Sequence, residues 1–522
     1  MNPPLRLPDT IQTIPAAIDF WAKETPNAPA LRALDGRVWS FRHLCDALAR
    51  VALRLDALGV ISTDRLVLAT PPGADTCLAL LGVASAAVAV PLNPALAAPE
   101  LRRDLARLAP RLLIVAGEKA DISAAIGDEL GIATIGLDAL LRGDDGPDAQ
   151  CVLDLGENPE AIAVIIHTSG TTGLPKRVPR THRSFLAGAR AARDSSALTP
   201  EDVLLLTSWA HTNSGVVNLC AAIANGGCCV AATGFHPADF PNLLDKHQPT
   251  WMVSTATELN LIMAAADAAG REMIAGPDAR LRLVRAGAQA MTPGTAERAE
   301  KRLRAWIFDG FGMSEASYIT ASGPTPADRR PGACGRPWRS EIRVLDDEGR
   351  DLPSGKTGEI VIRGETLFSG YLDDPEANAA VFLDGGWFRT GDIGSVDVDG
   401  YLTLSGRKGE TINRGGEKIA PLEVDHALLT HPAVADAAVF PIADGRFGED
   451  IVAAIVLRPG ATVSPRELRG WLLARLLPAK VPRRMWIVES LPRTLTGKVQ
   501  RGVLSERYLT RSADGERTTN SG

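Results

Sequence analysis

The sequence is poor in cysteine, and that scarcity excludes several classes of protein. It has 7 cysteines in 522 residues, and none of them forms a Cys-x-x-Cys pair or a Cys/His cluster. This pattern excludes a disulfide scaffold and argues against a structural zinc site. Unpaired thiols are typical of a reducing compartment, so the sequence predicts a cytoplasmic protein.

Long apolar runs and an excess of basic charge are also missing. The longest apolar stretch, residues 77–92, is too short for a membrane span, and it predicts a helix followed by a strand that ends at Pro91. The first residues lack the apolar region of a signal peptide. The formal net charge of −6 gives no support to bulk nucleic-acid binding. With 45% hydrophobic and 23% charged residues, the composition predicts a folded globular protein.

Helical and strand patterns alternate along the first 330 residues. A helical spacing of leucines and valine ends near Gly59, and short apolar strands follow at residues 65–69, 112–115 and 161–166. Strands separated by helices indicate a buried, largely parallel sheet. The expected fold class is therefore α/β for this large N-terminal part, with mixed or parallel sheets covered by helices.

The pattern changes from about residue 335. Strand patterns around turns, including a hairpin signal at Asp399 and Gly400, predict a small antiparallel barrel over about residues 335–405. A helix from about Leu422, two strands, and a helix opened by a capping box at Ser464 then predict a small α+β domain. The expected domains are 1–407, then 408–509 on a hinge, then a disordered polar tail over 510–522.

The strongest chemical signal is a loop that follows the strand at residues 161–166. Residues 167–176 have the sequence His-Thr-Ser-Gly-Thr-Thr-Gly-Leu-Pro-Lys. Glycines let backbone N–H groups approach an anion closely, and the hydroxyls and Lys176 add further donors for phosphate oxygens. The spacing differs from that of P-loop NTPases, in which a lysine follows the second glycine directly. We interpret the segment as a phosphate-binding loop, the alternative being a polar surface loop.

This loop resembles the phosphate loop of the adenylate-forming superfamily, which includes acyl- and aryl-CoA synthetases, peptide-synthetase adenylation domains and luciferases. Further motifs of that superfamily follow in the same order along nearly the whole chain. They are Phe-Gly-Met-Ser-Glu at 311–315, Trp-Phe-Arg-Thr-Gly-Asp at 387–392, Gly-Arg at 406–407, and Pro-Arg-Thr-Leu-Thr-Gly-Lys-Val-Gln-Arg at 492–501. Ordered matches of this kind are far more specific than any single motif.

The resemblance implies ATP-dependent activation of a carboxylate, which brings two anions together. Like unit charges about 4 Å apart repel by about 4 kcal/mol at an effective dielectric constant of about 20. By resemblance, Lys498 would relieve this repulsion as a catalytic residue, and Glu315 would hold Mg²⁺. Taken alone, a lysine in a Thr-Gly-Lys turn is more often a solvated surface residue, and the order of the motifs is what favours a catalytic role. The residues implied for the ATP phosphates are Thr168, Ser169, Gly170, Thr171, Thr172, Gly173 and the catalytic Lys176.

Other motif residues are implied to bind the rest of the nucleotide. Asp392 and Arg407 would contact the ribose, Phe311 would lie against the adenine in its Phe311–Gly312 motif, and Ser314 would touch the α-phosphate. Taken alone, a phenylalanine such as Phe311 is more commonly a core aromatic. A small-residue stretch would border the adenine and the acyl pocket, although the family usually has proline at position 290. It consists of Gly287, Ala288 and Gln289.

The acid and thiol sites are implied less directly. His211 matches an acyl-pocket histidine with a catalytic role, and a structural histidine is an equal alternative. Gly415 and Gly416 would line a tunnel for the thiol. The hinge would lie at Lys408 and Gly409, where the family normally has aspartate or lysine in place of the glycine.

The resulting hypothesis is an AMP-forming acid–thiol ligase that uses ATP, Mg²⁺ and coenzyme A with a small carboxylic acid. The nearest alternative is a ligase that loads a carrier-protein phosphopantetheine in trans. A non-catalytic nucleotide-binding scaffold and a luciferase-like oxidative enzyme are weaker alternatives. Local likenesses to aryl-acid ligases at 179–182 and to oxalate-type ligases at 281–285 leave the acid open.

Overall fold

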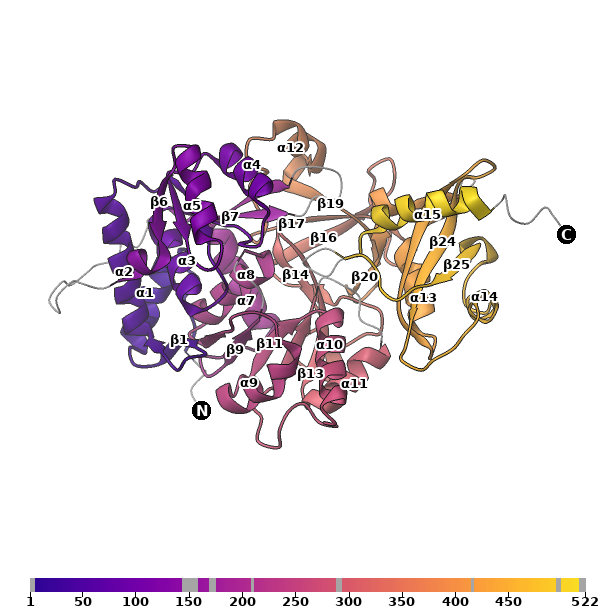
Figure 1. Ribbon diagram of the computed structural model, residues 1–522, viewed down its shortest axis with the longest axis horizontal. Helices are drawn as coiled ribbons and strands as arrows, with labels where there is room; N and C mark the ends of the chain where they lie inside the picture. The colour runs from indigo at the N-terminus through magenta and orange to yellow at the C-terminus, as the bar shows by residue number, and fades with distance from the viewer. Residues whose placement is uncertain are drawn as a thin grey trace.

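The computed structural model places the chain as a large N-terminal part followed by a smaller C-terminal part at one end (Figure 1). It describes residues 5–142, 158–168, 175–207, 211–287, 293–414, 417–493 and 499–515. Within these ranges no helix is long and apolar enough to cross a bilayer.

The first of two large sheets in the N-terminal part has six strands in the order β6-β5-β3-β4-β7-β8. Its strands run parallel except for the antiparallel β7–β8 pair. Helices α4 (Ala98–Leu108) and α5 (Ala120–Glu129) cover its outer face. The strands are β3 (Arg65–Ala69), β4 (Val88–Pro91), β5 (Leu112–Val115), β6 (Ala133–Gly136), β7 (Ile162–Thr168) and β8 (Lys176–Thr181).

The second sheet has nine strands in the order β15-β14-β13-β12-β11-β9-β10-β1-β2. The central strands are parallel, and both ends of the sheet are antiparallel. The outer face packs on α9 (Phe240–His247), α10 (Ala256–Ala268) and α11 (Pro293–Leu303). The strands are β1 (Pro29–Ala33), β2 (Val38–Ser40), β9 (Val203–Leu206), β10 (Cys228–Ala231), β11 (Trp251–Ser254), β12 (Leu283–Ala286), β13 (Trp306–Met313), β14 (Ser317–Ala321) and β15 (Arg336–Pro337).

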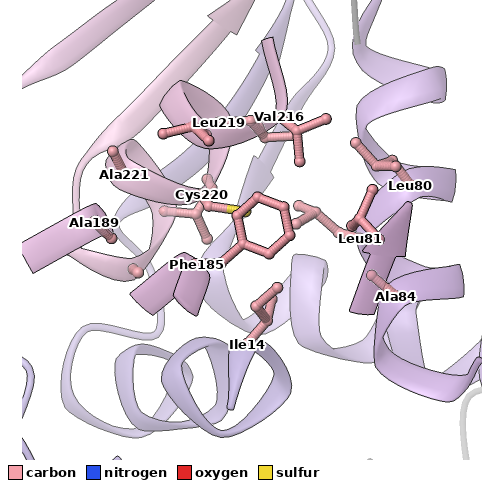
Figure 2. Close-up of a cluster of buried hydrophobic side chains, with 14 of the residues drawn as sticks. Ile14, Leu80, Leu81, Ala84, Phe185, Ala189, Val216, Leu219, Cys220 and Ala221 are labelled. Carbon is pink, nitrogen blue, oxygen red and sulfur yellow. The ribbon is translucent and has the colours of Figure 1, made fainter. Parts of the chain in front are cut away.

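A layer of helices between the two sheets holds the main core. Figure 2 shows the ring of Phe185 facing Cys220, Leu81 and Ile14 from three other helices. Helix α3 is apolar and buried almost all round, as expected of a helix packed on every side. The helix and strand predicted over residues 77–92 are confirmed as α3 and β4. The helices are α1 (Ile14–Glu24), α2 (Phe41–Ala57), α3 (Ala74–Ala86), α6 (Leu137–Leu141), α7 (His182–Ser196) and α8 (Asn213–Ala224).

The region expected to be a barrel is a five-stranded antiparallel sheet. The antiparallel pairing is confirmed, including the hairpin at Asp399–Gly400, but its pairings follow an open path, β16-β17-β19-β18, with β20 on β19. Gly400 has a φ of 84°, which favours glycine in this turn. The elements are β16 (Ser340–Leu345), β17 (Gly358–Gly364), α12 (Pro375–Val381), β18 (Phe382–Leu383), β19 (Trp387–Val396) and β20 (Leu402–Arg407).

The C-terminal part is a sheet with helices on both faces. One face packs on α13 (Pro421–Leu429) and α14 (Pro465–Leu473), and the other on α15 (Arg501–Gly515). The capping box at Ser464 is present, with the Glu467 N–H donating to the Ser464 hydroxyl. Helix α15 ends at Gly515. It therefore includes the start of the polar tail, residues 510–522, for which the sequence predicts disorder. The strands are β21 (Ile412–Arg414), β22 (Glu417–Ile419), β23 (Val434–Asp444), β24 (Gly448–Leu457) and β25 (Arg484–Ile487).

The contact between α2 and α3 depends on a glycine. A Cβ added at Gly82 would lie 2.8 Å from Cγ1 and 2.9 Å from Cβ of Val51. We expect Gly82→Ala to lower the free energy of unfolding by about 1–2 kcal/mol, because the two helices must separate. Gly294→Ala on α11, where the added Cβ meets open space, should change it by less than about 0.5 kcal/mol. Urea unfolding measures both, and a Gly82→Ala protein as stable as the parent would contradict this packing account.

Candidate active site

The predicted phosphate loop connects two paired strands. Thr168 at the end of β7 pairs with Lys176 at the start of β8, in antiparallel register. The two residues that flank the loop therefore lie side by side at the β7–β8 edge of the six-stranded sheet. The loop residues Ser169, Gly170, Thr171, Thr172 and Gly173 lie outside the described residues.

Lys176 begins a short chain of contacts that ends on Glu315. The Lys176 Nζ lies 4.3 Å from the centre of the Tyr371 ring, a cation–π distance. The Tyr371 hydroxyl donates to Glu315 Oε1 at 2.9 Å. Burial and the charge of Glu315 raise the pKa of Tyr371, so its phenol stays protonated as the donor. Glu315 itself is buried, and the chain places a lysine and a carboxylate on opposite sides of one tyrosine.

Arg180 holds this arrangement in place through hydrogen bonds to two backbone carbonyls. Its fully buried guanidinium donates from Nη1 to the Ser314 carbonyl at 2.8 Å and from Nη2 to the Thr366 carbonyl at 3.0 Å. Burial lowers its pKa to about 10, although the charge of Glu315 acts in the opposite direction. Arg180 therefore remains a cation at neutral pH. It connects β8 with the two segments that carry Glu315 and Tyr371.

Asp392 and Arg407 form a second charged pair in the same region. They are register partners on β19 and β20, and Arg407 Nε donates to Asp392 Oδ1 at 3.0 Å. Burial disfavours the charged guanidinium, but the charges of Asp392 and, more weakly, Glu315 together raise the pKa of Arg407. Phe368 connects this pair with the Glu315 chain: its N–H donates to the Glu315 carbonyl at 2.7 Å, and its ring centre lies 5.4 Å from that of Phe388 on β19, the strand that carries Asp392.

Strand β13 carries Phe311 and Gly312 to this region. The Phe311 N–H donates to the Thr320 hydroxyl at 3.3 Å. A Cβ at Gly312 would lie 2.0 Å from the Ser317 carbonyl oxygen, so no larger residue fits the β13–β14 hairpin there. Gly287 follows β12, and its N–H donates to the Ser254 carbonyl at 3.2 Å. Ala288 and Gln289 lie outside the described residues.

His211 lies just before α8. The next residue, Thr212, caps that helix, and its hydroxyl accepts from the Gly215 N–H at 3.0 Å. Asn213 in the first turn donates from Nδ2 to the Met313 carbonyl at 3.2 Å, which brings this turn next to the end of β13. Burial lowers the pKa of His211 to about 4, so the imidazole is neutral at physiological pH.

The predicted hinge lies between two ion pairs. Lys408 Nζ lies 3.0 Å from Oε2 of Glu359 on β17, in the N-terminal part. Glu410 Oε2 lies 3.4 Å from Nε of Arg501 on α15, in the C-terminal part. Gly409 lies between them in the 3₁₀ turn η4 (Lys408–Glu410), and a Cβ there would meet open space.

Three predicted residues of the C-terminal part fall outside the described chain. They are the catalytic candidate Lys498 and the thiol-tunnel candidates Gly415 and Gly416.

The sequence analysis assigned no role to Arg180 or Tyr371, although both contact the residues of this site. Arg180 lies on the strand that begins at the end of the predicted phosphate loop, which is a usable signal, whereas Tyr371 joins the site only through tertiary contact.

Comparison with known proteins identifies the family. A family model for the AMP-binding enzyme matches residues 18–372, and a model for the AMP-binding enzyme C-terminal domain matches residues 423–498. The chain belongs to the AMP-binding enzyme family. The resemblance stated from the sequence motifs is thereby confirmed.

Relatives with named activities match along almost the whole chain. An oxalate–CoA ligase from Arabidopsis thaliana is 32% identical, over 95% of this chain and 99% of that protein. A sulfoacetate–CoA ligase from Cupriavidus necator is 33% identical, over 95% and 97%. The crystal structure of ATP-bound MatB from Rhodopseudomonas palustris superposes with a TM-score of 0.83 at 26% identity, covering 94% and 99%.

These likenesses confirm the α/β fold class with its separate C-terminal domain. They also confirm the expected enzyme class, an AMP-forming acid–CoA ligase that works through an acyl-adenylate. Use of ATP, coenzyme A and a small carboxylic acid agrees with the family and with these relatives.

The neutral state of His211 gives a pH prediction. Its pKa in the folded protein, about 4, is below the usual unfolded value of about 6.5. As the pH falls from 6.5 towards 4, only the unfolded chain protonates this residue, so the parent protein loses stability there. His211→Asn removes that loss. Urea unfolding at pH 7 and pH 5 should show the parent losing up to about 2 kcal/mol more than the variant, and an equal loss in both would contradict a neutral His211.

Proposed function

We propose that this chain joins a small carboxylic acid to AMP at the site that contains Glu315, Tyr371, Lys176, Asp392 and Arg407, and then transfers the acyl group to coenzyme A. The observation that carries the proposal is the chain of contacts from Lys176 through the Tyr371 ring to Glu315, which Phe368 joins to the strand that carries Asp392. A carboxylate oxygen attacks the α-phosphorus of ATP, and the bond to pyrophosphate breaks. The thiol then attacks the acyl carbon, and AMP leaves.

The first step requires cations between the two reacting anions. We assign Lys498 to the attacking carboxylate and the α-phosphate, and Lys176 to the phosphates bound by Thr168 and the loop at 169–173. Ser314, whose backbone Arg180 fixes, is proposed to contact the α-phosphate. Electrostatic stabilisation of this kind is usually the largest single contribution to catalysis.

Glu315 is the residue proposed to hold Mg²⁺. The described residues contain no cluster of three or more His, Cys, Asp or Glu side chains suited to a metal. One buried carboxylate fits the way Mg²⁺ commonly binds, through one or two carboxylates together with substrate phosphates. When bound, the ion would neutralise charge on the phosphate oxygens.

The nucleoside is proposed to lie between Asp392 and Phe311. The Asp392 carboxylate and Arg407 would hold the ribose hydroxyls. Phe311, with Gly312, and the small residues Gly287, Ala288 and Gln289 would border the adenine. His211, neutral by burial, is proposed to line the pocket for the acid.

Thioester formation is proposed to use a rotation of residues 408–509 against residues 1–407. Lys408 is tied to the N-terminal part and Glu410 to the C-terminal part, which supports Gly409 as the pivot. The rotation would withdraw Lys498 and bring Gly415 and Gly416 to the thiol route. A rotation of this kind can bring different residues to the same site in the two half-reactions.

A cytoplasmic location is also part of the proposal. The described cysteines are unpaired, and burial raises the pKa of Cys77 and Cys220 to about 12. Free, unreactive thiols of this kind suit a reducing compartment.

The proposal is tested by pyrophosphate release with ATP and Mg²⁺ over a panel of carboxylic acids, with and without coenzyme A. The panel spans oxalate, malonate, sulfoacetate, short and medium fatty acids, benzoates and cinnamates. Sustained turnover that requires coenzyme A is the expected result. A single burst unaffected by coenzyme A would indicate a carrier-protein acceptor, and silence with every acid would favour a nucleotide-binding scaffold.

Lys498 can be assigned by separating the two half-reactions. We expect Lys498→Ala to slow adenylate formation by about 10²–10³-fold and to spare thiolysis of a supplied acyl-adenylate, because only the first step brings two anions together. Lys480→Ala is the matched control, since this lysine pairs with Glu423 in the same C-terminal part. It should leave both rates unchanged. Equal losses in both half-reactions of Lys498→Ala would remove Lys498 from the first step.

A further inference from the structure

A buried arginine on the strand that leads to Gly287 has no counter-ion among the described residues. Arg285 lies on β12, two residues before Gly287, and its side chain is 6% exposed. Burial lowers its pKa to about 10, so the guanidinium remains charged at neutral pH. Among the described residues no carboxylate forms an ion pair with it, and its Nη1 has no hydrogen-bond partner.

The contacts that Arg285 does make hold it in place without neutralising it. Its guanidinium carbon lies 3.5 Å from the centre of the Tyr318 ring, and Nη2 donates to the Thr320 carbonyl at 3.3 Å. A buried charge without a partner is costly, and leaving both N–H groups of Nη1 unsatisfied adds to the cost. An uncompensated buried charge of this kind is a candidate for a functional site, where a ligand can supply the missing partner.

The position of Arg285 connects it with the first turn of α8. The hydroxyl of Tyr318, whose ring lies under the guanidinium, donates to Asn218 Oδ1. Asn218 in turn donates from Nδ2 to the Ser214 carbonyl at 2.7 Å. Ser214 belongs to the turn that follows His211, and the N-terminus of a helix also attracts negative charge. Tyr318 and Asn218 therefore connect Arg285 with the first turn of α8, the turn that follows His211.

We propose that Arg285 binds a second anionic group of the acid substrate, a carboxylate or a sulfonate, so that the enzyme selects short dianionic acids. This inference rests on the proposed function, because it assigns the acid that is adenylated. One anionic group of the acid reacts with ATP. The other pairs with Arg285 and offsets the free-energy cost of burying its guanidinium without a partner. An acid with an apolar end leaves the guanidinium without a partner and binds weakly.

Matched acids test the preference in the parent protein. Oxalate is compared with acetate, malonate with propionate, and sulfoacetate with propionate, by kcat/KM for pyrophosphate release in the presence of coenzyme A. We expect the preferred dianion to exceed its monoanionic partner by about 100-fold or more. The malonate and sulfoacetate arms show whether the second group is a carboxylate or a sulfonate. Equal or better use of the monoanions would overturn the inference.

Variants of Arg285 identify the residue responsible. Arg285→Met should lose about 100-fold in kcat/KM for the dianion, with little change for the monoanion or in the KM for ATP. Arg285→Lys should keep part of the preference. Arg282→Met is the matched control: this arginine precedes the same strand and pairs with Asp202, so its loss should leave the preference unchanged. Equal losses for both acid classes in Arg285→Met would mean that Arg285 is only structural.

A binding measurement serves where a variant has low activity. In the parent protein, the dianion without ATP should raise the thermal midpoint, and Arg285→Met should lose this shift while remaining folded by circular dichroism. An unchanged shift in the variant would overturn the inference.

The failure of the ligase proposal and the failure of the Arg285 proposal give different results. Turnover with monoanions but not dianions leaves the ligase and refutes the role of Arg285, whereas no adenylation with any acid refutes the ligase itself.

Discussion

The burial of the Arg180 guanidinium is the interaction on which the rest of the site depends. A cation completely removed from water must satisfy its donors, and Arg180 does so on the Ser314 and Thr366 carbonyls. These partners come from segments more than 130 residues farther along the chain. The desolvated cation thus fixes the turn before Glu315 and the segment leading to Tyr371 against the strand that follows the phosphate loop.

Charge also links the proposed nucleotide site with the predicted hinge. Arg407 contacts Asp392, responds to Glu315, and is the last residue of β20 before the turn at Lys408–Glu410. The side chains on either side of Gly409 pair with opposite parts of the molecule. The proposed rotation about Gly409 would therefore begin beside the proposed ribose contact and would couple domain movement to nucleotide binding.

Local patterns in the sequence were sufficient for much of the fold. The bounds of β3 and β5 agree with the expected strands because fully buried parallel strands are continuous apolar runs. Gly312 appeared in a motif, and the structure gives its reason, since the Ser317 carbonyl leaves no room for a Cβ. Arg180, Tyr371 and Arg285 carried no assigned role in the sequence because their contacts come from distant segments. The open path of the antiparallel sheet likewise depends on pairings that no local pattern encodes.

The central claim is that the carboxylate of the acid attacks the α-phosphorus of ATP. It is tested most directly with an acid labelled with ¹⁸O in its carboxylate, followed by mass spectrometry of the products after turnover with coenzyme A. The account predicts one ¹⁸O atom in AMP, because the attacking oxygen stays on phosphorus when the thiol displaces AMP. Label in pyrophosphate or inorganic phosphate, or AMP without label, would contradict an acyl-adenylate.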